Sequence, residues 1–440
     1  MERFIIENLR SWKNSNRRKP LILKGARQVG KTYILEEFGK EFIDGYIKIN
    51  FDKEEDYAQF FEKTKNVDSI IQNLSFASGK KITKNTLIIF DEIQSCPKAL
   101  NSLKYFCEDA PDYYVVAAGS LLGLSLTDGF PVGKVDFFDL GPMTFEEFLL
   151  ANNDNNLYEY LKSISTIDLV PDFFHEKLIE KLKMYFIIGG MPEAVKVYTQ
   201  DKDIKLVDNV LSSILESYEL DFGKHAPIVD VPRIRLIWNS LPSQLARENK
   251  KFLYSLIKQG ARAREYENAL NWLKNADIVK KVSRITKPNL PLKSYEDLSS
   301  YKIYMLDVGL LRKHSNLDSS IFKSYNALFT EFKGSLTENY TLQSLLSVSE
   351  NTPYYWSKIP HEVDFILQKE NNIYPIEVKS GNNVHSASLK RYLENYPETK
   401  FAIRFSLQNL SFDGKILNIP LYLVEELDKI IKIVYSSNLI

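Results

Sequence analysis

The stretch LILKGARQVGKTYI, residues 21–34, decides the fold of the first part of the chain. An apolar run leads into a loop that begins at Gly25 and ends at Gly30-Lys31-Thr32, where a helical pattern starts. The glycines let the backbone curl so that its N–H groups face phosphate oxygens, and the positive helix end adds to the attraction. The loop therefore predicts a site for nucleotide phosphates, made of Gly25, Ala26, Arg27, Gln28, Val29, Gly30, Lys31 and Thr32.

Two acids at the end of a second apolar strand extend this site. Lys31 can reach the β- and γ-phosphates, and the hydroxyl of Thr32 can ligate Mg²⁺. The segment LIIFDE, residues 87–92, ends in Asp91, which we expect to hold Mg²⁺, and Glu92, which we expect to polarise the attacking water. The alternative is two solvated acids at a strand end. ATP and Mg²⁺ are the cofactors that this pattern predicts.

A third apolar strand ends in Ala118-Gly119-Ser120. The small polar side chain of Ser120 can touch the γ-phosphate or its water, and it can equally cap a turn or a helix. Arg27, inside the phosphate loop, can contact phosphate or a neighbouring domain. The sequence leaves both choices open.

Alternating apolar strands and helices predict an α/β fold with a parallel sheet that is covered by helices on both faces. The predicted strands are 20–24, 45–51, 86–93, 113–120 and 134–140, with a helix over 31–42. A helical stretch follows, then a hairpin near 283–297, a helix over 331–348, and strands 362–368 and 373–380 joined by a turn at Asn371-Asn372. We expect an ATPase domain (1–150), a helical lid (151–228), a winged-helix-like domain (229–312) and a small α/β domain (313–440).

The composition fits a globular protein with reduced thiols. Of 440 residues, 44% are hydrophobic, and 57 Lys and Arg balance 57 Asp and Glu, so net charge predicts no partner. The two cysteines, Cys96 and Cys107, show no metal-ligand spacing. No apolar run is long enough to span a membrane and the N-terminus has no signal-peptide pattern, so we expect a cytoplasmic protein without a membrane partner.

The motifs taken together resemble a family of bacterial and archaeal AAA-type ATPases with a C-terminal domain of unknown function. The resemblance rests on GARQVGKT, IIFDEIQ, AAGS, FPVGKVDFFDLGPMTFEEFL and GGMPEAV, and spans roughly residues 15–395. It implies ATP hydrolysis. Family members often carry an arginine where this chain has Lys134, so the role of that arginine is not carried over.

The family is also similar to signal-transducing ATPases whose lid contacts the nucleotide through a Gly-x-Pro element. Gly190-Met191-Pro192 matches that element, which makes Pro192 a predicted nucleotide contact. A helix stop made by the glycines and the proline is the alternative.

The middle of the chain is basic. Residues 242–293 hold twelve Lys and Arg against four acids, a local charge of +8. A helix over 252–259, a turn at Gly260, a helix over 266–273 and an extended hairpin fit a winged helix, which the family resemblance also implies. Such a module can place its second helix in the major groove of DNA or contact a protein. The alternative is a solvated or intramolecular face.

The C-terminal region holds a second group of candidate catalytic residues. Asp364 lies on the first hairpin strand and Glu377 and Lys379 on the second, while Glu338 on the preceding helix can complete the group. The spacing resembles the PD-(D/E)xK nuclease core, in which Asp364 and Glu377 would hold Mg²⁺ and Lys379 would position or activate water. A structural ion pair is the alternative.

These observations favour an ATP-driven switch that repositions the basic and nuclease-like modules. An active ATP-dependent DNA nuclease is a second hypothesis. A non-enzymatic interaction protein that holds ATP as a structural ligand is a third. Expected partners are ATP, DNA through residues 242–293, and a protein partner or a second copy of the chain.

Overall fold

The computed structural model describes residues 1–120, 131–247, 250–322, 330–349, 351–381 and 386–437. They divide into two compact units. The N-terminal unit contains Glu2–Gly141 with Asn275–Ile278, and the C-terminal unit contains Met1, Pro142–Lys274 and Val279–Ile440.

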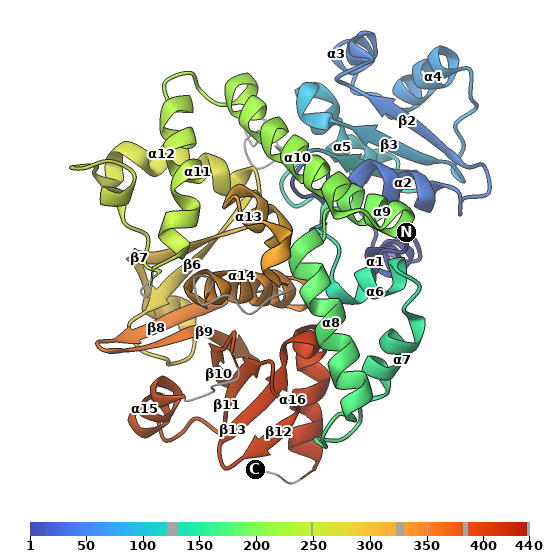
Figure 1. The fold of residues 1–440 in the computed structure, drawn as a ribbon. Coiled ribbons are helices and arrows are strands. Elements are labelled where there is room, and N and C mark those ends of the chain that lie inside the picture. The colour runs from blue at the N-terminus through green and yellow to red at the C-terminus, as the bar shows by residue number, and fades with distance from the viewer. Residues whose placement is uncertain (121–130, 248–249, 323–329, 350, 382–385, 438–440) are drawn as a thin grey trace. The chain divides into compact units, whose positions relative to one another are not determined.

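A five-stranded sheet in the order β2-β3-β4-β1-β5 forms the N-terminal unit, with all strand pairs parallel (Figure 1). Its strands are β1 (Leu21–Lys24), β2 (Tyr46–Asn50), β3 (Leu87–Asp91), β4 (Tyr114–Ala118) and β5 (Asp136–Asp139). The helices are α1 (Ile5–Lys13), α2 (Lys31–Gly39), α3 (Gln59–Glu62), α4 (Val67–Ser78) and α5 (Pro97–Asp109). The five predicted strands and the parallel α/β fold are confirmed.

Both faces of this sheet are buried, which explains why its strands are continuously apolar. On one face, Ile88 and Phe90 belong to a core that also contains Leu74 of α4 and Leu103 of α5. On the other side, Trp12 of α1 contacts ring edges of α2 and β4. Because parallel strands end at the same edge, this packing brings the C-terminal residues of β1, β3 and β4 to one side of the sheet.

A mixed eight-stranded sheet in the order β12-β13-β11-β10-β9-β8-β6-β7 organises the C-terminal unit (Figure 1). Its strands are β6 (Val279–Ile285), β7 (Glu296–Met305), β8 (Tyr354–Lys358), β9 (His361–Lys369), β10 (Asn372–Val378), β11 (Ala402–Ser406), β12 (Ser411–Asp413) and β13 (Ile416–Pro420). The first helices are α6 (Phe145–Ala151), α7 (Asn155–Ser163), α8 (Asp172–Ile188), α9 (Pro192–Asp201), α10 (Ile204–His225), α11 (Val231–Leu245) and α12 (Ala263–Asn275). The later ones are α13 (Val308–His314), α14 (Thr330–Val348), α15 (Ala387–Asn395), the 3-10 helix Leu421–Glu426 and α16 (Leu427–Ser436).

The hairpin β6–β7 belongs to the same sheet as the C-terminal strands, because β6 pairs with β8 in parallel. The predicted division at 312/313 therefore does not separate two sheets. The division of the chain into four domains stays a prediction, and the described residues form two compact units. In the described part of the chain, no helix is long and apolar enough to cross a membrane.

Two local predictions are wrong. Residues 252–259 are not a helix but hold only a 3-10 turn at Tyr254–Leu256, because the backbone of Phe252 pairs with Tyr301 of β7 and Leu253 bonds to the side chain of Gln244. The hairpin turn is not Asn371-Asn372, because Asn372 already pairs with Lys369 in the β9–β10 ladder. The turn is therefore Glu370-Asn371, with Glu370 at φ 51°.

Candidate functional site

The phosphate loop lies between β1 and α2 and has the backbone that its glycines require. Gly25 has φ 144° and Gly30, which precedes the first residue of α2, has φ 95°. A Cβ atom on Gly25 would lie 2.1 Å from the carbonyl oxygen of Leu140. Gly25 is thus fixed both by its positive φ and by the close approach of the chain that leaves β5.

Lys31 is buried inside this loop. Its Nζ donates to the carbonyl oxygens of Gly25 and Ala26, at 2.9 and 2.7 Å. Burial lowers the pKa of Lys31 to about 8, against the opposing effect of Glu92 and Asp91. A phosphate group that reached this ammonium would replace part of the water that Lys31 has lost, which favours anion binding.

Thr32 and Asp91 lie in direct contact. Thr32 Oγ1 donates to the carboxylate of Asp91 at 3.1 and 3.2 Å, and Asn50 Nδ2 donates to the same carboxylate at 3.3 Å. Burial, followed by the charge of Glu92, raises the pKa of Asp91. A hydroxyl and a carboxylate at this spacing fit Mg²⁺, which prefers oxygen ligands and keeps several waters or phosphate oxygens around it.

Glu92 follows β3 in a left-handed conformation with φ 50°. This conformation is uncommon for a residue with a side chain and is found often at functional sites. Its carboxylate accepts a hydrogen bond from Gln94 Nε2 at 2.6 Å. The predicted role of Glu92 in activating water stays a prediction.

Arg27 and Ser120, which the sequence analysis left open, meet each other. Arg27 Nε donates to Ser120 Oγ at 3.1 Å. Ser120 is buried two residues after the end of β4, and residues 121–130 lie outside the described residues. The contact joins the phosphate loop to the segment that follows β4.

Two further residues of this site were not predicted from the sequence. Arg3 is buried and donates to the carbonyl oxygens of Val29, at 2.9 Å, and Gly141, at 2.8 Å. It thereby ties the phosphate loop to the chain that follows β5. Asn50 is the other, and its position as the polar residue that ends an alternating strand was the available signal. Arg3 has no such local signal, because both of its partners are distant in sequence.

The Gly190-Met191-Pro192 element lies between α8 and α9 in the C-terminal unit. Asp307 Oδ2 accepts a hydrogen bond from the N–H of Gly190 at 2.7 Å, and a Cβ atom on Gly190 would lie 2.1 Å from the carbonyl oxygen of Met143. These close approaches explain the glycines, and Pro192 is the first residue of α9. The nucleotide contact of Pro192 stays a prediction.

The basic middle is less charged than its count suggests. Lys250 pairs with Glu338, Arg284 with Asp297 at 2.7 Å, and Lys293 with Glu296 at 2.5 Å, and these three acids lie outside 242–293. On α12, Ala269, Leu270, Trp272 and Leu273 are buried as expected. Arg262 and Arg264 are exposed at its start. Arg262 and Arg264 are therefore among the exposed basic residues that remain for a polyanion, together with Lys258, Lys274 and Lys287.

The four predicted residues of the C-terminal group fall on adjoining elements. Asp364 on β9 accepts a hydrogen bond from the N–H of Val378 at 2.8 Å, next to Glu377 on β10. Lys379 Nζ lies 2.8 Å from Glu377 Oε1. Glu338 on α14 accepts a hydrogen bond from the hydroxyl of Tyr304 at 3.0 Å.

Lysines that the sequence analysis missed also reach this group. Lys302 on β7 lies 3.9 Å from Glu338 Oε2 and 4.0 Å from Asp364 Oδ1, and Lys250 pairs with Glu338. Burial, followed by the charge of Glu338, raises the pKa of Asp364 to about 7. Across the residues that the structure describes, no three His, Cys, Asp or Glu side chains are grouped so that they could hold a metal ion. Mg²⁺ needs only one or two carboxylates, so the metal roles of Asp364 and Glu377 stay predictions.

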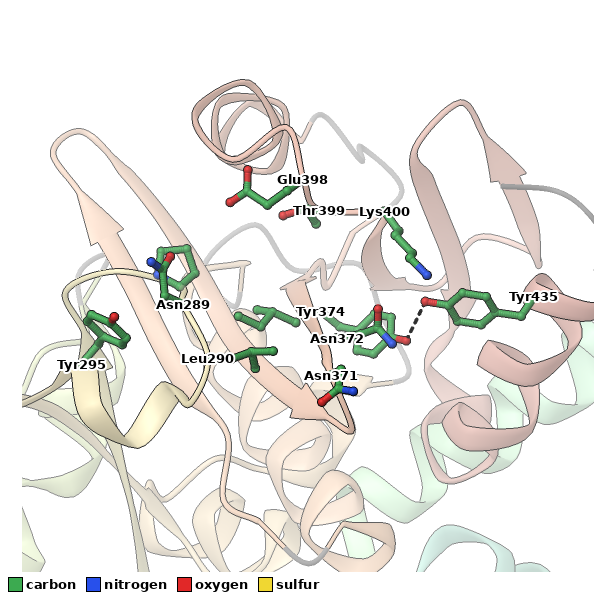
Figure 2. Close-up of a pocket in the computed structure, with 12 residues that line it drawn as sticks. Asn289, Leu290, Tyr295, Asn371, Asn372, Tyr374, Glu398, Thr399, Lys400 and Tyr435 are labelled. Atoms are coloured by element: carbon green, nitrogen blue, oxygen red, sulfur yellow. Dashed lines mark hydrogen bonds between the residues drawn. The ribbon is translucent and has the colours of Figure 1, made fainter.

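A separate pocket of about 430 Å³ opens beside the turn of the β9–β10 hairpin. Its lining includes Asn371, Asn372, Tyr374, Lys400 and Tyr435, which are labelled in Figure 2. The hydroxyls of Tyr374 and Tyr435 are 3.1 Å apart. None of the predicted catalytic residues lines this pocket.

Family models match three parts of the chain. Residues 17–149 match the model described as an AAA domain. Residues 179–321 and 333–423 match two domains of unknown function, DUF8612 and DUF4143. No curated protein matches the sequence. The AAA match covers the phosphate loop, Asp91, Glu92 and Ser120.

Several solved structures match the chain at low structural similarity. A Walker-type ATPase of Pyrococcus abyssi has 16% identity and a TM-score of 0.44, and the match covers 70% of this chain and 94% of that one. The Orc1 protein of Aeropyrum pernix in complex with DNA has 12% identity and a TM-score of 0.30, over 71% and 90% of the two chains. Both TM-scores are low. The likeness of the N-terminal unit to an AAA domain therefore rests on the family-model match over residues 17–149 and on the geometry of the phosphate loop.

Proposed function

We propose that this protein binds ATP with Mg²⁺ and hydrolyses it, and that the nucleotide state controls the basic and C-terminal modules. The observation that carries the proposal is the direct contact between Thr32 and Asp91 beside a loop in which Lys31 is buried. A hydroxyl, a carboxylate and an ammonium are there together, as a magnesium-bound triphosphate requires.

Each residue has a defined part in this proposal. The loop amides and Lys31 bind the phosphates, and Thr32 and Asp91 would hold Mg²⁺. When bound, the metal ion would neutralise charge on the phosphate oxygens. Glu92 would take a proton from the attacking water and orient it.

Two variants separate binding from hydrolysis. Lys31→Ala is expected to abolish ATP binding, because it removes the buried ammonium that lies within the phosphate loop. Glu92→Gln is expected to keep ATP binding and to stop turnover, because the amide cannot accept the proton. Binding is measured with a fluorescent ATP analogue and turnover by phosphate release. If both variants turn over ATP as fast as the wild type, the assignment is wrong, and ATP that stays intact on the wild-type protein would favour a structural ligand.

For the output, we propose that the winged-helix-like region binds DNA phosphates through its exposed arginines. What supports this is the exposure of Arg262 and Arg264 at the start of α12, while its apolar residues are buried. The test is ATP turnover with and without duplex or single-stranded DNA at two salt concentrations. Stimulation that fades with salt is expected, because phosphate contacts release counterions. Turnover that DNA leaves unchanged at low salt would refute the coupling.

A further inference from the structure

The C-terminal acidic cluster consists of Glu338, Glu362, Asp364 and Glu377, which come from α14, β9 and β10. Glu377 and Glu338 are almost fully buried, and the other two are largely covered. Buried carboxylates are retained in proteins when a cation compensates them, either a side chain or a metal ion. The question is which cation serves this cluster.

Lys302 on β7 lies at the centre of three of these carboxylates. Its side chain has no exposed surface, and its Nζ lies 2.6 Å from Glu362 Oε1, 3.9 Å from Glu338 Oε2 and 4.0 Å from Asp364 Oδ1. The approach to Glu362 is an ion pair by distance, although its angles do not meet those of a hydrogen bond. The ring of Tyr355 faces the same ammonium, with its centroid 5.0 Å away.

The position of this lysine follows from the fold. Lys302 is a charged residue within the strand YKIYM, whose neighbours Tyr301, Ile303 and Tyr304 are all buried. A fully buried ammonium is costly unless several oxygens surround it, so the three carboxylates are what makes Lys302 tolerable there. Burial lowers the pKa of Lys302, but the oxygens of Tyr304, Glu362 and Glu338 outweigh it, and the pKa is raised above its ordinary value.

Two further lysines help to compensate the negative charge of the cluster. Lys250 pairs with Glu338, and Lys379 pairs with Glu377 at 2.8 Å. Four carboxylates therefore face three ammonium groups. A divalent ion bound between Glu338 and Asp364 would lie beside the ammonium of Lys302 and would be repelled by it.

We propose that Lys302 is the resident cation of the C-terminal acidic cluster and takes the place that a divalent metal ion would otherwise occupy. The cluster is then complete without metal, and the C-terminal module does not cleave phosphodiesters by metal-assisted hydrolysis. The role follows from the contacts of Lys302 and does not depend on the ATPase proposal.

One carboxylate oxygen of the cluster could instead serve as a ligand of a metal ion. Glu377 Oε2 is buried and has no hydrogen-bond partner among the described residues. If the cluster binds a metal ion, this oxygen and Asp364 are the expected ligands. A test must therefore include both residues.

The test is Mn²⁺ binding to the full-length protein without nucleotide, followed by electron paramagnetic resonance of the free ion. The wild type, Asp364→Asn and Glu377→Gln are expected to bind Mn²⁺ identically, because any ion at the phosphate loop is common to all three. If both substitutions remove one bound Mn²⁺ per chain, the proposal is overturned. This comparison uses the wild-type lysine, so it stands even where a lysine variant does not fold.

A second arm creates the metal site. Lys302→Met is expected to gain one Mn²⁺ per chain that the wild type does not bind, and Lys302→Met with Asp364→Asn is expected to lose it again. Lys379→Met is the matched control and is expected to gain none, because its ammonium is partly exposed and pairs with Glu377 alone. A folded Lys302→Met protein without the new site would contradict the proposal. So would Mg²⁺-dependent DNA cleavage by the wild type that Asp364→Ala abolishes.

Discussion

Arg3 offers the sharpest test of how the phosphate loop is held. The perturbation is Arg3→Met, which keeps the length of the aliphatic stem and removes the guanidinium. The hydrogen bonds to the carbonyl oxygens of Val29 and Gly141 are lost. The prediction is that the loop loses its geometry while the rest of the sheet stays folded.

The magnitude follows from the two bonds. A hydrogen bond from a charged donor contributes on the order of 1.5–3 kcal/mol, and part of this is recovered if water reaches the freed carbonyls. We expect the loop conformation that binds ATP to be destabilised by about 2–3 kcal/mol. Each 1.4 kcal/mol corresponds to about tenfold, so the affinity for ATP should fall by roughly 30- to 150-fold. The turnover rate at saturating ATP should change much less, because the hydrogen bonds of Arg3 to Val29 and Gly141 go to backbone oxygens and not to a predicted catalytic side chain.

The assay combines binding of a fluorescent ATP analogue, turnover against ATP concentration, and urea unfolding. Arg10→Met is the matched control, because Arg10 lies in the same N-terminal region but forms an exposed ion pair with Glu41. Exposed pairs contribute little, so this variant should bind ATP like the wild type. Wild-type affinity in Arg3→Met, or an equal loss in Arg10→Met, would refute the reasoning.

Three other predictions concern the C-terminal unit. Asp307→Ala should destabilise the protein by about 3–5 kcal/mol in urea unfolding, because the N–H of Gly190 and other buried donors lose their acceptor, and a loss below about 1 kcal/mol would contradict this. Burial, followed by the charge of Glu425, raises the pKa of Glu146 to about 8. Between about pH 5 and pH 8, Glu146 is therefore protonated in the folded state and ionised in the unfolded state. The stability of the folded state should therefore fall as pH rises through that window. In Glu146→Gln the thermal melting temperature should depend less on pH, and an unchanged pH dependence would show that Glu146 is not the group responsible. Reversing Arg262 and Arg264 to glutamate should weaken DNA binding and reduce its salt slope by about two, without changing the melting temperature, and unchanged binding would exclude this surface.

The parallel sheet and the phosphate loop were predictable because their signals are local. A short apolar run that leads to a glycine or an acid identifies a buried strand, and β1, β3 and β4 all carry such a run. The helix predicted over 252–259 failed for the opposite reason. Its backbone bonds to Tyr301 and to Gln244, and such distant partners override a local helical pattern.

The same distinction applies to the two candidate sites. For the nucleotide site, the sequence by itself determined Gly25, Lys31, Thr32 and Asp91, because loop geometry and strand ends are set by residues close together in the chain. For the C-terminal cluster, the sequence supplied four candidate residues on a helix and a hairpin. Only the tertiary structure decided that Lys302, from a strand some 60 residues before that hairpin, lies among the carboxylates. Charge compensation depends on distance in space, and no periodicity or spacing in the sequence records it.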